Sequence, residues 1–347
     1  MKIGVMGAGA IGCYVGGRLL ASGADVLLVG RASIADEIAR CGLRLTDYRG
    51  TDVVVGPDRV RVATAPAELA ACDVVLVTVK GGDTAATAAA LAPVLSPACV
   101  VVSLQNGVHN ADILRAALGH DRVRAGVVPF NVLRKGDGAF HQGTSGTIAI
   151  ERVVAVGGDG GHGHVADGLV DGLVGALARA RLKARVRADI ERVQWGKLLV
   201  NLNNAVNALA GVPIKEMLAD PGYRRVMAAC LREAVVVLRA AGIRPRLDPP
   251  VPPALVPRIL ALPDALFRPA LRVLVRVDPQ ARSSMSDDLV RGRKTEVDAL
   301  NGEIVRVAAA AGVPAPVNAA VVALVHAAEG HGLARTPSAE LCARVGV

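Results

Sequence analysis

The apolar residues in the first part of the chain fall into short continuous runs that alternate with helical patterns. The runs occupy residues 1–6, 24–29, 73–79 and 99–104. Helical patterns lie between the first two runs and at 34–41, 66–71 and 84–95, and the segment from 41 up to Thr64 is expected to be rich in strands. Continuous apolar strands alternating with helices are typical of a parallel sheet covered on both faces. Further strands are predicted at 125–132, 143–150 and 184–186, with a turn near 135–138 and a helix at 165–182.

The periodicity changes near residue 190 and stays helical almost to the end of the chain. A proline-rich segment at 245–257 interrupts it, and we expect this segment not to be helical. The pattern therefore predicts an α/β protein with an N-terminal, Rossmann-type doubly wound sheet domain in residues 1–187. A C-terminal all-α domain is predicted in residues 188–347.

The first strand leads directly into a glycine-rich turn, Gly7-Ala8-Gly9-Ala10-Ile11-Gly12, and then into a helix and a second strand. In a dinucleotide-binding turn the first glycine permits the tight bend and the second lets the backbone approach a pyrophosphate. The third glycine lets the helix pack closely on the strand, and the helix N-terminus faces the phosphate charge. Because the motif lies between a strand and a helix, we interpret it as a nucleotide site rather than a structural turn.

The end of the second strand carries Gly30-Arg31, with no acidic residue before Asp36. NAD-binding proteins place an Asp or Glu here to accept a hydrogen bond from the ribose 2′-hydroxyl. A guanidinium group suits a 2′-phosphate instead, because it can bind phosphate oxygens in a bidentate way. The sequence favours NADPH over NADH, although Arg31 alone would also be compatible with a solvated loop.

Polar residues follow two other predicted strands. Lys80 ends the third strand, and Gln105-Asn106-Gly107 follows the fourth. Ligands of open α/β sheets bind outside the carboxyl ends of the strands. We therefore expect Arg31, Lys80 and Asn106 to belong to one ligand site.

Composition excludes several classes of function. The 347-residue chain is 52% hydrophobic but has no apolar run long enough to span a membrane. Its net charge of +9 makes nucleic-acid binding a function to consider. However, the basic residues are dispersed, and the aromatic residues that would stack on bases make up only 2%. An anionic cofactor and an anionic substrate explain the charge equally well. The sequence is compatible with a homodimer and does not fix the oligomeric state.

The cysteines and histidines give no sign of a metal site. Six cysteines are scattered without a C-x-x-C pair, which predicts reduced thiols in a cytoplasmic protein. Residues 157–164 read GGDGGHGH, and we expect an exposed flexible loop there rather than a metal-binding one.

The predicted helical domain opens with a polar stripe. Lys197, Asn201 and Asn204 lie at i, i+4 and i+7 and so share one helix face. The intervening Leu198, Leu199 and Val200 predict a largely buried helix. Burying a lysine and two amides is costly unless they line a polar cleft, although ordinary inter-helix hydrogen bonding is the alternative.

A second cluster begins at Ser283-Ser284, either of which could cap a following helix. If one continuous helix runs onward, Ser284, Asp288 and Glu296 fall within about a third of its circumference. A solvated acidic face would give the same pattern.

Taken in order, these motifs resemble the ketopantoate reductase (2-dehydropantoate 2-reductase) family from end to end. The resemblance rests on the glycine turn, Lys80, Gln105-Asn106-Gly107, Trp195-x-Lys197-x3-Asn201, Ser283-Ser284-Met285, Thr295-Glu296-x-Asp298 and Asn301-Gly302. It implies NADPH-dependent reduction of 2-dehydropantoate to (R)-pantoate, in the synthesis of pantothenate and coenzyme A.

The resemblance also implies a role for each matching residue. NADPH would bind at Gly7 to Gly12, with Arg31 and Lys80 at its 2′-phosphate and Glu296 at the nicotinamide ribose. Asn106 would contact both cofactor and substrate. Lys197 would donate the proton, Asn201 and Ser284 would hold the substrate, and Asp288 would support them.

One departure concerns the substrate pocket. The family often has a second substrate-binding asparagine four residues after Asn201, where this chain has Ala205. Either Asn204 substitutes, or the natural substrate is another branched 2-oxo acid. The chain also exceeds compact members in length, mainly around residues 245–278. A regulator that senses the nucleotide without turnover is a further alternative. The presence of Lys197, Asn201, Ser284 and Glu296 argues against it, because a sensor needs no proton donor.

Overall fold

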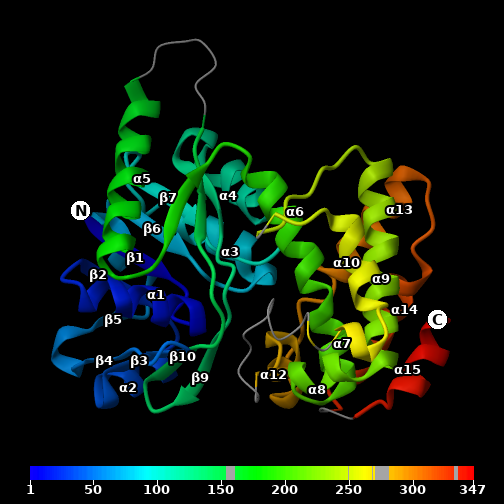
Figure 1. The fold of residues 1–347 in the computed structure, drawn as a ribbon. Coiled ribbons are helices and arrows are strands. Elements are labelled where there is room, and N and C mark those ends of the chain that lie inside the picture. Colours follow the sequence, from blue (N-terminus) through cyan, green and yellow to red (C-terminus); the bar gives the residue numbers. More distant parts are fainter. Residues whose placement is uncertain (154–160, 249, 268, 270–280, 332–334) are drawn as a thin grey trace. The chain divides into compact units, whose positions relative to one another are not determined.

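The computed structural model describes residues 1–153, 161–248, 250–267, 269, 281–331 and 335–347. The chain divides into two compact units, Met1–Ile190 and Glu191–Val347. The sequence pattern had placed this boundary between residues 187 and 188. Each unit is described by itself below (Figure 1).

The first unit is built on an eight-stranded sheet in the order β12-β11-β8-β7-β6-β1-β2-β5. Its strands are β1 (Lys2–Met6), β2 (Asp25–Val29), β5 (Arg61–Ala63), β6 (Val74–Val77), β7 (Val100–Ser103), β8 (Val123–Val127), β11 (Ile148–Glu151) and β12 (Ala184–Arg187). All neighbours are parallel except β8 and β11, which are antiparallel. The prediction of a parallel-dominated sheet with a helical region after it is confirmed.

The helices of this unit are α1 (Ala10–Ala21), α2 (Ala32–Cys41), α3 (Thr84–Leu91), α4 (Asn110–Leu118) and α5 (Gly161–Arg179), with short 3₁₀ turns η1 (Pro57–Arg59), η2 (Pro66–Ala71), η3 (Gly81–Asp83) and η4 (His120–Arg122). Helix α3 ends earlier than predicted, because Pro93 has no N–H group to continue the helix. Helix α5 begins at Gly161, so the predicted loop at 157–164 is wrong for its last four residues. Residues 157–160 lie outside the described residues.

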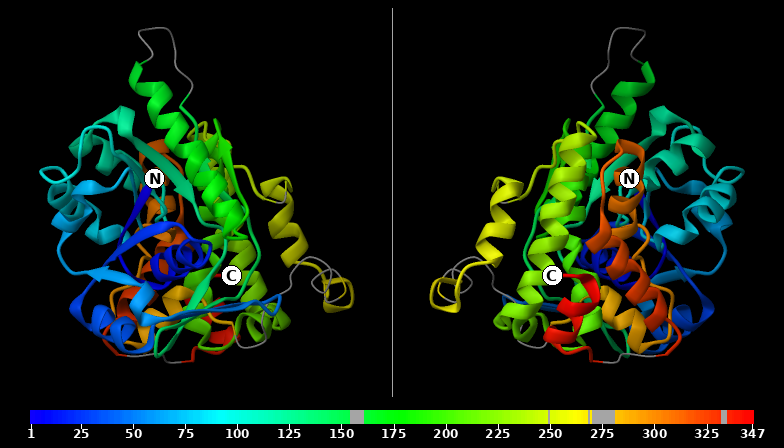
Figure 2. Two further views of the ribbon diagram at one scale, coloured as in Figure 1. Left: turned by 90° about the vertical axis from the view of Figure 1, so that its left-hand side faces the viewer. Right: turned by 90° about the vertical axis from the view of Figure 1, so that its right-hand side faces the viewer.

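A second, four-stranded sheet was not predicted as a separate sheet, although two of its strands lie in the segment up to Thr64 that was expected to be rich in strands. It has the order β4-β3-β10-β9 and consists of β3 (Leu43–Asp47), β4 (Asp52–Val55), β9 (Val132–Gly136) and β10 (Ala139–Gln142). The sheet packs against α1 (Figures 1 and 2). The predicted turn near 135–138 is present as the β9–β10 turn, in which Asp137 and Gly138 have φ values of 47° and 70°.

Two strands predicted in this region differ from the observed ones. The strand expected at 125–132 is split, because β8 ends at Val127 and β9 begins at Val132. The strand expected at 143–150 is formed only from Ile148 onward. Residues 143–147 read GTSGT, and such residues favour turns because they bond locally to the backbone or adopt unusual φ values.

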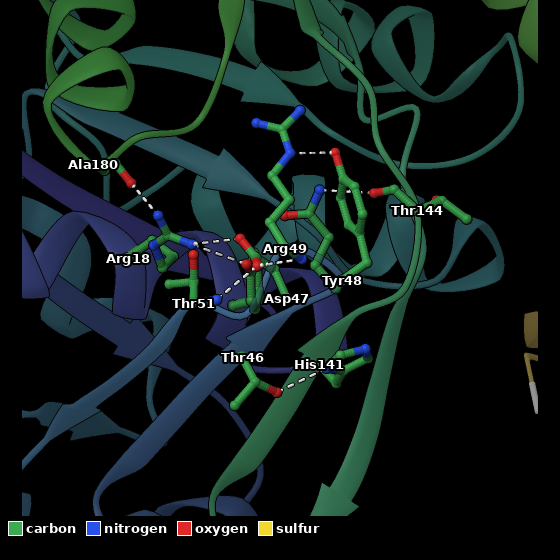
Figure 3. A network of polar contacts seen from close by, with 11 residues as sticks. Arg18, Thr46, Asp47, Tyr48, Arg49, Thr51, His141, Thr144 and Ala180 are labelled. Carbon is green, nitrogen blue, oxygen red and sulfur yellow. Dashed lines mark hydrogen bonds and ion pairs between the residues drawn. The ribbon is translucent and has the colours of Figure 1, made fainter. Parts of the chain in front are cut away.

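A buried arginine joins the second sheet to the rest of the unit. Arg18 on α1 is 4% exposed and donates to the carbonyl oxygen of Ala180 at 2.8 Å and to the hydroxyl of Tyr14 at 3.0 Å. Its guanidinium lies 3.9 Å from the carboxylate of Asp47, at the end of β3 (Figure 3). The same carboxylate accepts backbone hydrogen bonds from Arg49 and Thr51, so a buried charge is balanced and also orders the β3–β4 turn.

The second unit is helical. Its elements are α6 (Ile190–Asn201), α7 (Asn203–Ala210), α8 (Ile214–Ala219), α9 (Pro221–Ala240), η5 (Pro253–Leu255), α10 (Val256–Leu260), α12 (Ser284–Val290), α13 (Asn301–Ala311), α14 (Pro316–Ala328) and α15 (Ser338–Val345). The long helix α9 contacts α10, α13, α14 and α15, so it is the central helix of the unit. The contact with the C-terminal helix α15, drawn in red, is visible in Figure 2.

The proline-rich segment is partly helical, against expectation. Pro253 begins η5, and Pro257 is the second residue of α10. Proline is tolerated in the first turn of a helix because the N–H groups there have no intrahelical acceptor. Arg224, 2% exposed, holds the residues that follow this segment by donating to Leu260 O, Leu262 O and the Asp264 carboxylate, and its guanidinium stacks 4.3 Å from the centre of the Phe267 ring.

Within the described residues, no helix is both long enough and apolar enough to cross a membrane.

Candidate active site

The glycine turn after β1 is closely packed on one side and open on the other. Gly7 has a φ of +112°, and a Cβ atom there would lie 2.7 Å from the backbone nitrogen of Val79. A Cβ on Gly12 would lie 2.2 Å from the carbonyl oxygen of Gly7 and 2.6 Å from the Thr78 hydroxyl. A Cβ on Gly9 would meet nothing within 4 Å. Gly7 and Gly12 are thus required by packing, whereas Gly9 leaves the backbone accessible to a ligand.

Helix α1 begins at this open position. Its N-cap is Gly9, which makes no side-chain cap, and its first turn has no acidic residue. The backbone N–H groups of Ala10, Ile11 and Gly12 have no acceptor within the helix, as in the first turn of any α-helix. Together with the helix dipole, these N–H groups favour a negatively charged ligand such as a dinucleotide pyrophosphate. The donor set and the open space at Gly9 both fit such a cofactor.

Arg31 follows β2 and is the N-cap residue of α2. Its side chain is exposed, and within the described part of the chain it makes no ion pair. The preceding Gly30 packs closely on the glycine turn, since a Cβ there would lie 2.6 Å from the Cβ of Ala8. The structure therefore places Arg31 next to the turn that fits the pyrophosphate.

Lys80 and Asn106 lie on the loops after β6 and β7, and a buried hydrogen-bond network joins these loops. The side chain of Gln105 donates to Val79 O at 3.2 Å and to the Thr84 hydroxyl at 2.7 Å. The Thr84 hydroxyl donates to Asn110 Oδ1 at 2.7 Å, and Asn110 Nδ2 donates to Asn106 O at 2.5 Å. Sequence reasoning missed Thr84 and Asn110, which hold Asn106 at the carboxyl end of the sheet.

The helical unit brings together two of the predicted residues, Lys197 and Glu296. Lys197 lies on α6 and is partly buried. Burial lowers the pKa of Lys197 to about 8, while the negative charge of Glu296 opposes this by raising it. A lysine with a pKa near 8 gives up its proton readily near neutral pH, which is a property of general acids.

Asn201 and Asn204 are both partly exposed, as polar residues that line an accessible surface should be. The helix is interrupted between them, because α6 ends at Asn201 and α7 begins at Asn203. Val200 is 56% exposed, so the expectation of a largely buried helix is wrong at this position, although Leu198 and Leu199 are buried. Ala205, at 0% exposure, belongs to the core, whereas Asn204 is available to a ligand.

Ser283, not Ser284, caps α12. Its hydroxyl accepts from the Ser286 amide at 3.1 Å and donates to Asn204 O at 3.1 Å, while its own amide donates to Asn207 Oδ1 at 2.8 Å. These bonds attach the start of α12 to α7 and leave the first helical residue, Ser284, exposed. Asp288 is buried.

The single helix considered for residues 284–296 is not formed. Helix α12 ends at Val290, and turns follow until α13 begins at Asn301. Gly292, with a φ of +61°, lies directly after the end of α12. Glu296 therefore reaches Lys197 from an irregular segment and not from the helix face shared with Ser284.

Gly196, next to Lys197, has a packing role that the sequence did not reveal. A Cβ there would lie 1.9 Å from the carbonyl oxygen of Arg246. The Arg246 amide donates to Arg192 O at 2.7 Å, so the start of the proline-rich segment crosses α6 at this glycine.

Comparison with known sequences assigns the family. Residues 3–154 match the family described as ketopantoate reductase PanE/ApbA, and residues 189–329 match its C-terminal family. A 2-dehydropantoate 2-reductase of Halobacterium salinarum is 30% identical over 334 residues, covering 96% of this chain and all of the relative. The chain belongs to the ketopantoate reductase family. It is an oxidoreductase acting on CH–OH groups.

Solved structures agree with this assignment. A PanE/ApbA family ketopantoate reductase from Ralstonia eutropha is 32% identical, with a TM-score of 0.77 over 95% of this chain and 99% of that one. The ternary structure of D-mandelate dehydrogenase with NADH and anilino(oxo)acetate has a TM-score of 0.76 at 24% identity, covering 95% and 99% of the two chains. The second likeness concerns the fold.

Proposed function

We propose that this chain reduces 2-dehydropantoate to (R)-pantoate with NADPH, in the cytoplasm and in the synthesis of pantothenate and coenzyme A. The observation that carries the proposal is Lys197, a partly buried lysine whose pKa is lowered to about 8, beside Glu296. The choice of substrate is based on the relatives that are named 2-dehydropantoate 2-reductase.

In this proposal each residue of the site binds one part of the cofactor or substrate, or transfers a proton. The N–H groups of Gly7 to Gly12 would bind the pyrophosphate, Arg31 and Lys80 the 2′-phosphate, and Glu296 the nicotinamide ribose. The cofactor, when bound, supplies a hydride to the C2 ketone. As charge builds on the ketone oxygen, the ammonium of Lys197 stabilises it and delivers a proton. Asn106, Asn201, Asn204 and Ser284 would orient the substrate.

The preference for NADPH is a proposal about Arg31 in particular. The fold alone does not decide it, because D-mandelate dehydrogenase, of the same fold, has been solved with NADH. What supports NADPH is an exposed arginine at the end of β2, adjacent to the glycine turn, at the position where NAD-binding proteins place an acid.

The test is a steady-state assay of NADPH consumption with 2-dehydropantoate and a series of other 2-oxo acids. We expect the highest kcat/KM with 2-dehydropantoate. A higher value with another branched or aromatic 2-oxo acid would show that Ala205 marks an altered pocket. No oxidation of NADPH with any 2-oxo acid would favour a nucleotide-sensing regulator instead.

The proposed partner is therefore a small 2-oxo acid, and nucleic acid is not among the proposed partners. A homodimer remains a prediction, for which light scattering of the purified chain is the direct measurement.

The pH dependence of the reaction should follow Lys197. Its pKa is lowered to about 8, and only the protonated form can donate a proton. We expect kcat/KM for reduction to be constant below about pH 7 and to fall roughly tenfold per pH unit above pH 8, whereas oxidation of pantoate should rise through the same range. A falling limb near pH 10, where an ordinary lysine titrates, would contradict this assignment.

A further inference from the structure

The segment that carries Glu296 has no regular secondary structure. It lies between the end of α12 at Val290 and the start of α13 at Asn301. Val297, at 0% exposure, anchors it in the core, and the Gly302 amide donates to Val297 O at 2.9 Å. A helix or strand would fix the position of Glu296 through a regular series of backbone bonds. Here the Glu296 carbonyl oxygen accepts from the Ala299 amide at 3.1 Å, and side-chain contacts with the neighbouring residues add to this bond.

Glu329 makes the most direct of these contacts. It directly follows the last residue of α14, and its Oε1 atom accepts two hydrogen bonds from Thr295. The Thr295 amide donates at 2.8 Å and the Thr295 hydroxyl at 2.7 Å. One carboxylate oxygen thus holds both the backbone and the side chain of the residue that immediately precedes Glu296.

His326 extends this contact to the other side of Glu296. Its Nδ1 lies 3.4 Å from Glu329 Oε2, and its Nε2 lies 2.9 Å from Asp298 Oδ1. The side chain of Asp298 is 74% exposed and that of Glu329 only 18% exposed. Because exposed ion pairs contribute little, Glu329 is the stronger attachment and His326 a secondary one.

The charge state of Glu329 suits this role. Burial raises the pKa of Glu329, but the hydrogen bonds from Thr295 and His326 outweigh burial and hold the pKa below its usual value. The carboxylate is therefore ionised at neutral pH. A charged acceptor makes stronger hydrogen bonds to N–H and O–H groups than a neutral one does.

We propose that Glu329 is a positioning residue: by binding Thr295 it holds Glu296 where the Glu296 carboxylate acts on the ammonium of Lys197. The importance of this for catalysis rests on the proposed function, in which Lys197 donates the proton. The positioning itself is a statement about the folded chain and needs no substrate.

The test is the pKa of Lys197, measured in the substrate-free protein from the ¹³Cε chemical shift of labelled lysine, with Lys197→Arg identifying the signal. Glu296→Gln removes the charge and should lower the pKa by roughly one unit. Glu329→Ala should lower it by a similar amount, because Glu296 is released. In Glu296→Gln/Glu329→Ala the second change should add no further shift.

Two matched variants separate positioning from loss of charge. Glu329→Gln loses the charge but keeps an oxygen that accepts from Thr295, so Lys197 should titrate as in the wild type. Glu340→Ala removes an exposed glutamate on α15 and should also leave the titration unchanged. An equal shift in Glu329→Gln and Glu329→Ala would overturn the proposal, as would an unchanged Lys197 in Glu329→Ala.

Kinetics distinguish failure of this proposal from failure of the proposed function. If the wild type reduces 2-dehydropantoate, the falling limb of the pH profile should move to lower pH in Glu329→Ala and return in Glu329→Gln. If the wild type reduces no 2-oxo acid, the proposed function fails, while the titration of Lys197 still tests the positioning.

Discussion

Lys197→Ala should lower kcat for 2-oxo acid reduction by roughly one hundred- to ten-thousand-fold, the range that a general acid contributes. The partly buried ammonium of Lys197 is the proposed source of the proton and of stabilisation for the developing oxyanion. The residues proposed for the pyrophosphate and the 2′-phosphate all lie in the other compact unit, Met1–Ile190, and only Glu296 is shared with the unit of Lys197, so the dissociation constant for NADPH should stay within about threefold. Stopped-flow turnover and fluorescence titration with NADPH measure the two quantities.

Two further variants sharpen this result. Lys197→Arg keeps a positive charge but donates its proton far less readily, so it should remain strongly impaired. Lys215→Ala removes an exposed lysine on α8 and should leave turnover unchanged. Added small primary amines should partly restore Lys197→Ala. Unchanged turnover in Lys197→Ala would remove this residue from the chemistry.

Arg31→Ala should weaken NADPH binding roughly ten- to one-hundredfold and change NADH binding by no more than about twofold. The expected loss corresponds to one charge-assisted hydrogen-bonded pair, about 1.5–3 kcal/mol. The 2′-phosphate is the only group that distinguishes the two cofactors, so an arginine that binds it must act on NADPH alone. Calorimetric titration with each cofactor at the same ionic strength gives the two ratios.

A second arginine controls for overall charge. Arg59 is exposed on η1 of the same unit, and Arg59→Ala changes the net charge by the same amount. It should affect both cofactors weakly and equally. Equal losses of NADPH and NADH in Arg31→Ala would mean that Arg31 contacts a part shared by both, and the preference for NADPH would need another explanation.

Local features of the site were predictable because short-range physics decides them. The glycine turn needs Gly7 at a positive φ, and a Cβ on Gly12 would lie 2.2 Å from the carbonyl oxygen of Gly7, five residues earlier. Lys197 and Asn201 share a helix face because they are four residues apart. The serine cap at the start of α12 was also recognisable, although only the structure chose Ser283 over Ser284.

Errors arose from turn-forming residues inside a predicted element and from contacts with distant segments. The strand predicted at 143–150 covered a turn-forming stretch, and the strand that does form there pairs with β8 and β12, which lie far away in the sequence. The helix considered through Glu296 stops at Val290, where Gly292 follows in a left-handed conformation. The proline-rich segment includes η5 and the start of α10, and Arg224 on α9 holds the end of α10 and the residues after it.

By itself the sequence determined the two-part plan, the glycine turn after the first strand and the family, because each depends on residues that are close together or in a fixed order. Only the tertiary structure decided that Glu296 acts on Lys197, and that Glu329 and Thr295 hold the segment between α12 and α13. The physical reason is that desolvation, charge and hydrogen-bond partners are properties of atoms brought together by packing. A pKa near 8 for a lysine cannot be read from the residues beside it in the chain.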